Sequence, residues 1–142
     1  MKLRIFYDGI KYRLKSSKEV LKLIEKVIRK EKRIPGDLNF IFTKDSEIIK
    51  MNKEFLKHNY FTDVIAFVNN QREIISGEIY LSIDTIKRNA FNYKVSLREE
   101  VIKVMIHGTL HLCGYVDERK EDKEMMNNVE NKWLEEYLRN EI

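Results

Sequence analysis

The chain of 142 residues is 43% hydrophobic and 35% charged, which gives enough apolar material for one packed core and too little length for two ordinary domains. No apolar run approaches the roughly 20 residues that span a bilayer, and the N-terminal residues lack the pattern of a signal peptide, so we expect a soluble cytoplasmic protein. The single cysteine, Cys113, excludes a disulfide framework and a cysteine-rich zinc module. A metal site in this chain would therefore consist of histidine and carboxylate ligands.

The formal net charge of +4 is unevenly distributed along the chain. Residues 1–33 carry twelve basic and four acidic side chains, whereas residues 118–142 carry five basic and eight acidic side chains. This asymmetry would let one face attract a polyanion through phosphate contacts. The alternative is that both segments are ordinary solvated helix faces.

The first segment predicts a short β-hairpin. Residues 2–6 and 11–14 alternate polar and apolar side chains around Asp8-Gly9, a dipeptide typical of tight turns. We therefore expect two short antiparallel strands near the N-terminus.

An amphipathic helix should follow. Ser16 and Glu19 have the spacing of a capping box, and apolar residues then recur at helical intervals until Pro35-Gly36 ends the pattern. The opposite face of this helix carries a row of lysines: Lys18, Lys22, Lys26 and Lys30. Like charges four residues apart weaken a helix slightly, so the row is either tolerated on a solvated surface or used for binding.

The rest of the chain alternates strands and helices. We expect strands at residues 38–42, 64–68 and 78–83, and helices beginning with an Asp45 cap and spanning residues 84–93, 97–113 and 122–138. Ser96 and Glu99 form a second capping box. The last helix has a predicted core stripe of Met125, Met126, Val129, Trp133 and Leu134. This interleaving predicts an α/β layered domain rather than a helix bundle or a β-sandwich.

The segment from His107 to Asp117 carries a metal-binding pattern. His107 and His111 are four residues apart on a predicted helix, so both imidazoles project from one face, at the spacing that binds a single ion. Gly114 allows the helix to stop with a left-handed residue, after which the chain can turn back and Asp117 can offer a carboxylate. Two histidines, one carboxylate and an open position for water form a common catalytic zinc arrangement.

Other readings exist for these residues. An HxxxH pair alone often arises by chance, Asp117 could merely cap the last helix, and Cys113 is expected to be buried packing rather than a ligand.

Gly108 stands where zincin proteases carry their glutamate base. Glycine inside a helix costs about 1 kcal/mol relative to alanine, so we expect a close approach to the backbone there. Without that base, metal-assisted attack on a phosphodiester is favoured over peptide hydrolysis.

The stretch from His107 to Tyr115, HGTLHLCGY, resembles the signature HGxLHLxGYDH of the YbeY family of bacterial ribosomal RNA maturation endoribonucleases. Met125 and Glu130 resemble the Met and Glu that follow in the last helix of that family. This first match is specific enough to carry the assignment.

Two further segments resemble the same family. Residues 51–55 and 62–67, MNKEF and TDVIAF, look like its LNxxF and TDVLSF segments, and residues 76–79 are similar to its GD-I strand. The resemblance extends over about residues 38–138.

The resemblance implies a single α/β (α+β) domain over residues 1–142, with a mixed four- to five-stranded sheet packed against helices, one of them a zincin-like metal helix. It implies one zinc ion per chain, bound by His107, His111 and Asp117, with the bound water as candidate nucleophile. It also implies single-strand-specific cleavage of RNA in 16S ribosomal RNA maturation and ribosome quality control. The partners would be ribosomal RNA and the ribosome or its small subunit.

Two positions depart from the family pattern. The third histidine of the family falls on Asp117, with Val116 where aspartate is usual, so the ligand set becomes two nitrogens and one oxygen, which can bind zinc more weakly or admit another metal. The family arginine after LNxxF falls on Leu56. Lys57 or His58 could supply the lost positive charge as substrate-binding residues, and an exposed surface role is the alternative for either.

These observations predict a metal-dependent endoribonuclease of ribosome maturation, with His107, His111 and Asp117 as its catalytic and metal-binding residues. Two alternatives stay open: a metallohydrolase of another substrate class, such as a peptidase, and a non-catalytic ribosome assembly factor whose metal is structural. A structural zinc is normally held by four protein ligands. Only three are found in the pattern, which favours catalysis.

Overall fold

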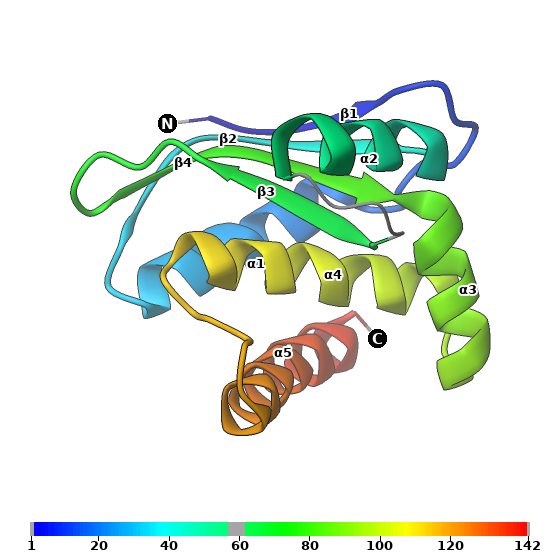
Figure 1. Cartoon of the computed structure of the whole chain (residues 1–142). Coiled ribbons are helices and arrows are strands. Elements are labelled where there is room, and N and C mark those ends of the chain that lie inside the picture. The colour runs from blue at the N-terminus through cyan, green and yellow to red at the C-terminus, as the bar shows by residue number, and fades with distance from the viewer. Residues whose placement is uncertain (1, 57–61, 142) are drawn as a thin grey trace.

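A four-stranded mixed sheet lies at the centre of the computed structural model, in which residues 2–56 and 62–141 are described (Figure 1). The strands are β1 (Lys2–Tyr7), β2 (Ile34–Thr43), β3 (Val64–Val68) and β4 (Ile74–Ser82). They lie in the order β1-β2-β4-β3, with β1, β2 and β4 parallel and β3 antiparallel to β4 at one edge. This arrangement confirms the predicted α/β fold with a mixed sheet.

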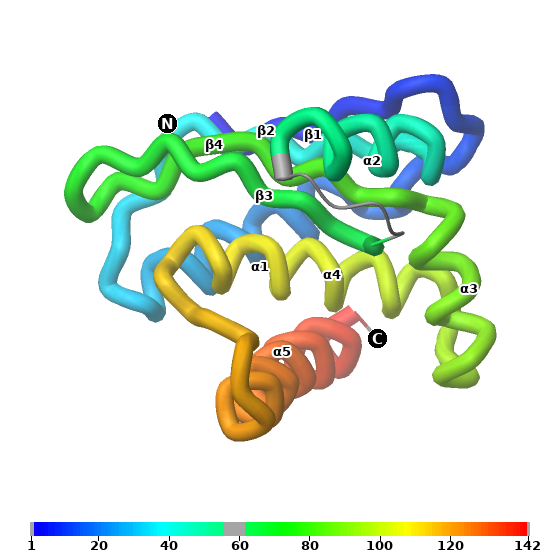
Figure 2. Tube along the Cα trace, viewed as in Figure 1, coloured from blue at the N-terminus to red at the C-terminus, as the bar shows by residue number. Residues whose placement is uncertain are grey.

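Helices cover the sheet on both sides. They are α1 (Ser17–Lys30), α2 (Asp45–Met51), the π-helical turn η1 (Asn52–Leu56), α3 (Ile83–Tyr93), α4 (Leu97–Leu112) and α5 (Lys120–Asn140). Helices α1 and α4 pack on one face of the sheet, and α2 lies on the opposite side (Figure 1). Figure 2 shows that the chain turns away from the sheet after α4, so that α5 packs under α4 as an outer layer. None of the described helices has the length and apolar character needed to cross a membrane.

The predicted N-terminal hairpin is wrong. Strand β1 pairs in parallel with β2, and α1 forms the crossover that a parallel pair requires. Residues 11–14 form no strand, and the Leu14 amide instead donates a hydrogen bond to the Tyr7 hydroxyl at 3.0 Å. The alternation of residues 10–14 arises because Ile10, Tyr12 and Leu14 pack against the core while the segment leads into α1.

Helix α1 has the predicted apolar face but not the predicted ends. Ser16 precedes it in the left-handed region, with φ 58° and ψ 40°, and its side chain accepts no capping hydrogen bond. The helix ends at Lys30, whereas Pro35 and Gly36 lie within β2. The buried face consists of Val20, Leu23, Ile24, Val27 and Ile28, and the four lysines of the predicted row are all exposed.

Of the two other predicted helix caps, the one at Asp45 is wrong and the one at Ser96 is confirmed. Asp45 is the first residue of α2 rather than its cap, because its carboxylate accepts hydrogen bonds from Ser82, Thr85 and Arg88 instead. Ser96 does cap α4, since its hydroxyl accepts a hydrogen bond from the Glu99 amide at 3.1 Å.

The predicted core stripe of α5 is wrong at one position. Met125 is 57% exposed, whereas Met126 is buried. Val129, Trp133 and Leu134 are partly buried against the core. Among the described elements, α5 has its extensive contacts with α4 and lies outside the layer that packs on the sheet, so its buried face is narrower than that of a helix lying on the sheet.

Gly108 lies where α4 comes closest to the sheet. A Cβ atom placed on it would lie 3.0 Å from Ile79 Cγ2, 3.2 Å from Ile79 Cδ1 and 3.4 Å from Val64 Cγ2. The close approach predicted from the sequence is therefore confirmed, and the partners are side chains of β3 and β4.

We expect Gly108→Ala to destabilise the fold by about 1 kcal/mol. Alanine should gain about 1 kcal/mol of helix propensity, but overpacking of a close-packed core typically costs about 1–3 kcal/mol. Chemical denaturation measures the difference. In an Ile79→Val background, which removes the atom at 3.2 Å, the same substitution should cost less. A more stable Gly108→Ala protein would show that the helix is free to move away.

Candidate metal centre

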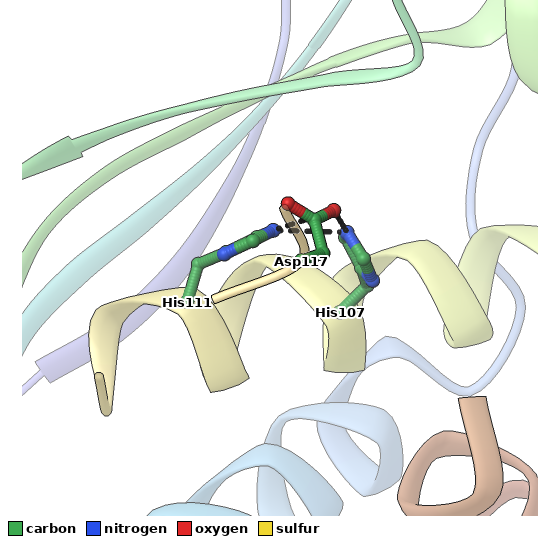
Figure 3. Close-up of side chains that lie close together, drawn as sticks. All are labelled: His107, His111 and Asp117. Carbon is green, nitrogen blue, oxygen red and sulfur yellow. Dashed lines mark hydrogen bonds and ion pairs between the residues drawn. The ribbon is translucent and has the colours of Figure 1, made fainter. Parts of the chain in front are cut away.

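Three side chains converge at the C-terminal end of α4 (Figure 3). The Nε2 atoms of His107 and His111 lie 3.0 Å apart, and each lies 3.5 Å from Oδ2 of Asp117. Ligands about 2.0–2.1 Å from one tetrahedral ion lie roughly 3.3 Å from one another. The three atoms therefore have the mutual spacing of ligands around a single ion, and no other such group of three occurs among the described residues.

The end of α4 returns the chain to this point. Gly114 adopts φ 105°, a conformation that suits glycine, and its amide donates to the carbonyl of His111 at 3.0 Å. The Tyr115 amide donates to Leu110 at 3.0 Å, which closes the helix. The Tyr115 hydroxyl then donates to Glu31 at 3.1 Å, which fastens the loop to the end of α1. The predicted role of Gly114 is confirmed, and Asp117 faces the histidines instead of capping α5, whose cap position is taken by another residue.

The remaining ring nitrogens of both histidines have hydrogen-bond partners. Nδ1 of His107 lies 2.5 Å from Oε2 of Glu130 on α5, and Nδ1 of His111 lies 3.1 Å from the carbonyl oxygen of Tyr115. Such partners fix the ring orientation and the tautomer that leaves Nε2 free for a metal. Burial alone would lower the pKa of His107, but the hydrogen bond and charge of Glu130 raise that pKa overall.

We expect Glu130→Gln to weaken metal binding by roughly 10-fold or more. The glutamine keeps the size of the side chain but loses the charge that makes the His107 imidazole a better ligand, and loss of such a partner typically costs 10–100-fold. Competition with a chromophoric chelator measures the affinity. The exposed Glu135, also on α5, provides the matched control Glu135→Gln, which should bind metal like the unchanged protein. Equal affinities in both variants would remove Glu130 from the site.

A cavity of about 460 Å³ adjoins the three converging side chains. Its wall includes the antiparallel edge strand β3, and its polar lining includes Asn52, Thr62 and Asp63. Burial raises the pKa of Asp63, although the neighbouring His107 opposes the shift. The carboxylate of Asp117 is 41% exposed, so solvent and substrate reach the open side of the group.

The sequence pattern missed two residues of this site. Only the family resemblance points to Glu130, because an acidic residue 23 positions from His107 has no sequence spacing that predicts a contact between the two side chains. Asp63 stands in a segment that matched the family without any role being assigned, and only the fold brings it to the cavity. The predicted substrate-binding residues Lys57 and His58 lie outside the described residues, so that pair stays a prediction.

Cys113 takes no part in the group. It is 7% exposed, and burial raises the pKa of its thiol to about 11. A thiol that stays protonated is a poor metal ligand. The prediction of buried packing at this position is therefore confirmed.

The fold and the side-chain group define a class of protein: an α/β domain with an HxxxH helix and a nearby carboxylate that together could hold a metal ion, at a cavity beside an edge strand. A family model described as Endoribonuclease YbeY matches residues 9–138. The chain belongs to the YbeY endoribonuclease family. The predicted class of enzyme, a hydrolase that acts on RNA, is thereby confirmed.

Individual relatives agree with this membership. The chain is 35% identical to Endoribonuclease YbeY of Flavobacterium psychrophilum over 91% of its length and 92% of that protein. It is 38% identical to Endoribonuclease YbeY of Cytophaga hutchinsonii over 85% of both chains. The solution structure of the protein TM1509 from Thermotoga maritima is similar with a TM-score of 0.65 and 29% identity, covering 96% of this chain and 89% of that one.

Proposed function

We propose that this chain is a zinc-dependent, single-strand-specific endoribonuclease that acts in 16S ribosomal RNA maturation and ribosome quality control, with residues 1–142 as its single domain. The observation that carries the proposal is the convergence of His107, His111 and Asp117 at an open cavity. Ribosomal RNA and the small ribosomal subunit are the proposed partners, in the cytoplasm.

The donor set fits zinc. Two imidazole nitrogens and one carboxylate oxygen leave a fourth position open, as catalytic zinc sites do. When bound, the ion activates water and neutralises charge on a phosphate. His107, His111 and Asp117 would hold the ion; Glu130 fixes the ring of His107, and the Tyr115 carbonyl fixes that of His111. Asp63 lines the same cavity, where its carboxyl group would hold or move a proton.

An open fourth position argues against a purely structural metal. Among the described residues, no fourth histidine, cysteine or carboxylate joins the group. A structural zinc normally has four protein ligands. The proposal of a catalytic site therefore has more support than that of an assembly factor with a structural metal.

Cleavage assays separate the three candidate functions. Zinc-loaded protein should cut single-stranded RNA and leave a duplex of the same sequence and casein intact, and His111→Ala should cut none of them. Cleavage of casein would support the peptidase alternative. A zinc-loaded protein that binds ribosomes but cuts no RNA would support the assembly factor.

The lysine row on α1 is the proposed contact for the RNA backbone. Lys30 is next in sequence to Glu31, which accepts a hydrogen bond from Tyr115 in the loop that carries Asp117. Lys22 and Lys26 share a surface hollow with Glu136 of α5 and with Glu141, which follows that helix, and Lys30 shares a second hollow with Glu136.

Replacing Lys18 and Lys30 by glutamine should flatten the dependence of log affinity on log salt by roughly one to one and a half, because each phosphate contact to a single strand contributes about 0.7 to the slope. Binding of labelled single-stranded RNA at several salt concentrations measures this slope. The exposed Lys87 and Lys94 provide a control with the same change in net charge. An equal change in both double variants would mean that α1 is only a solvated face.

A further inference from the structure

A second cavity of about 460 Å³ lies on the other side of His107, between α3, α4 and α5. Its lining includes Glu100, Lys103, Asn127 and Tyr93. His107 lines both cavities, so a ligand in the second one would lie next to a group bound at the metal centre. The volume is within the range of small-molecule sites.

Glu100 is a buried residue whose carboxylate has no hydrogen-bond partner among the described residues. The residue is 6% exposed, its amide donates to the Ser96 carbonyl at 3.1 Å, and its carboxylate accepts no hydrogen bond from the residues that the structure describes. Burial, with the charges of Asp63 and Glu130, raises the pKa of Glu100 to about 7, although Lys103 opposes the shift. Glu100 lines the cavity, so a ligand that brings donors there would supply the hydrogen bonds that the carboxylate lacks within the described protein.

The groups around Glu100 complete a pattern of hydrogen-bonding atoms. Lys103 stands one helical turn further along α4, on the same face, and its Nζ donates to Asn127 Oδ1 at 2.8 Å. The ammonium group therefore has donors to spare next to the carboxylate. Tyr93, at the end of α3, is 63% exposed at the cavity and offers a ring face for stacking.

We propose that this cavity binds a guanine base of the RNA substrate, next to the phosphate held at the metal centre. The N1–H and N2–H groups of guanine would donate to the two carboxylate oxygens of Glu100, and Lys103 would donate to O6. Among the four RNA bases, only guanine presents two adjacent donors beside an acceptor on its Watson–Crick edge. The biological meaning of this site rests on the proposed nuclease function.

A divalent cation is the competing occupant of an acidic cavity. Asp63, Glu100 and Glu130 all line this one. Among the described residues, however, their carboxylate oxygens do not all lie within the 4.8 Å of one another that ligands of a single ion would need. The carboxylate of Glu130 is already engaged by His107. A flat base that needs only Glu100 and Lys103 therefore fits the cavity better than an ion.

Nucleoside binding tests this site without any cleavage. At about pH 8, where the Glu100 carboxyl with its pKa of about 7 is ionised, we expect guanosine to bind the zinc-loaded protein about tenfold more tightly than inosine, which lacks only the N2 amino group, because a hydrogen bond to a charged acceptor is worth about that factor. The amide resonances of residues 103 and 127 report binding in an NMR titration. Glu100→Gln should bind both nucleosides equally, and the neighbouring Glu99→Gln, which does not line the cavity, should keep the preference.

A second variant keeps the test decisive if Glu100→Gln does not fold. Lys103→Met should weaken guanosine and inosine alike, because both carry O6. Equal affinity of the unchanged protein for the two nucleosides, or a preference that persists in Glu100→Gln, would overturn the proposal. Displacement of guanosine by Mn²⁺ from this cavity would assign it to a cation instead.

Mapping of cleavage positions connects the cavity to the reaction. Single-stranded RNA cut by the unchanged protein should show guanine enriched at one fixed position beside the cut, and the enrichment should vanish in Glu100→Gln but not in Glu99→Gln. Guanosine binding without any cleavage of RNA would refute the nuclease and leave the pocket standing. Cleavage without guanine enrichment would refute the pocket and leave the nuclease standing.

Discussion

Replacing His111 by alanine should abolish zinc binding and RNA cleavage together. The unchanged protein should contain about one zinc per chain, because Nε2 of His111 lies 3.0 Å from Nε2 of His107 and 3.5 Å from Oδ2 of Asp117. Loss of a partner that only orients a ligand typically costs 10–100-fold, and loss of the ligand itself should cost more than about 100-fold. Elemental analysis and single-stranded RNA cleavage measure the two effects.

A surface substitution controls for damage to the fold. Asn128 is exposed on α5, and Asn128→Ala should keep both zinc and activity. The circular dichroism of His111→Ala should match that of the unchanged protein, because His111 is only partly buried and its loss opens no core cavity. A His111→Ala protein with full zinc content would mean that the metal lies elsewhere.

Acid should release the metal because protons compete with it for the histidine nitrogens. Only a neutral imidazole binds zinc, so protons compete with the ion as the pH falls toward and below the histidine pKa. Glu130 raises the pKa of His107, and the protonated form of this ring therefore persists to a higher pH than in an ordinary histidine. Zinc affinity should accordingly fall as the pH falls.

The strongly periodic parts of this fold were predictable from sequence. The buried face of α1 follows from residues at helical spacing, and β3 and the capped start of α4 follow from local composition. The order of the strands was not predictable in the same way. Local alternation in residues 10–14 comes from burial against the core, and it has the same period as a paired strand.

The residues of the candidate site also fall into two groups: those that local sequence predicts and those that only tertiary packing brings together. His107, His111 and Asp117 lie within eleven residues of sequence, so helix geometry and one glycine stop bring them together. Glu130 reaches His107 only because α5 packs under α4, and Asp63 reaches the cavity only because β3 lies at the edge of the sheet. Such contacts depend on tertiary packing, which has no period to detect in one sequence.

Three substitutions of Asp117 should show whether its carboxylate binds the metal or only lies near it. Asp117→His should still bind zinc, because histidine at this offset completes the pattern that the family resemblance indicates. Asp117→Ala should weaken the metal by more than about 10-fold, since it leaves two nitrogens that cannot hold an ion firmly. Asp117→Asn should lie between them, because an amide oxygen is a weaker, uncharged donor.

The loop that carries Asp117 makes this series interpretable. Its position depends on the Gly114 turn and on the Tyr115 contacts to His111 and Glu31, and none of the three substitutions touches these groups. The neighbouring Val116 is 54% exposed, and Val116→Ala provides the control for a change in the loop without a change of ligand. Zinc affinity in the order His, Asp, Asn, Ala would identify residue 117 as the third ligand. Equal affinity of Asp117→Ala and Val116→Ala would identify its carboxylate as a neighbour of the site that takes no part in holding the metal.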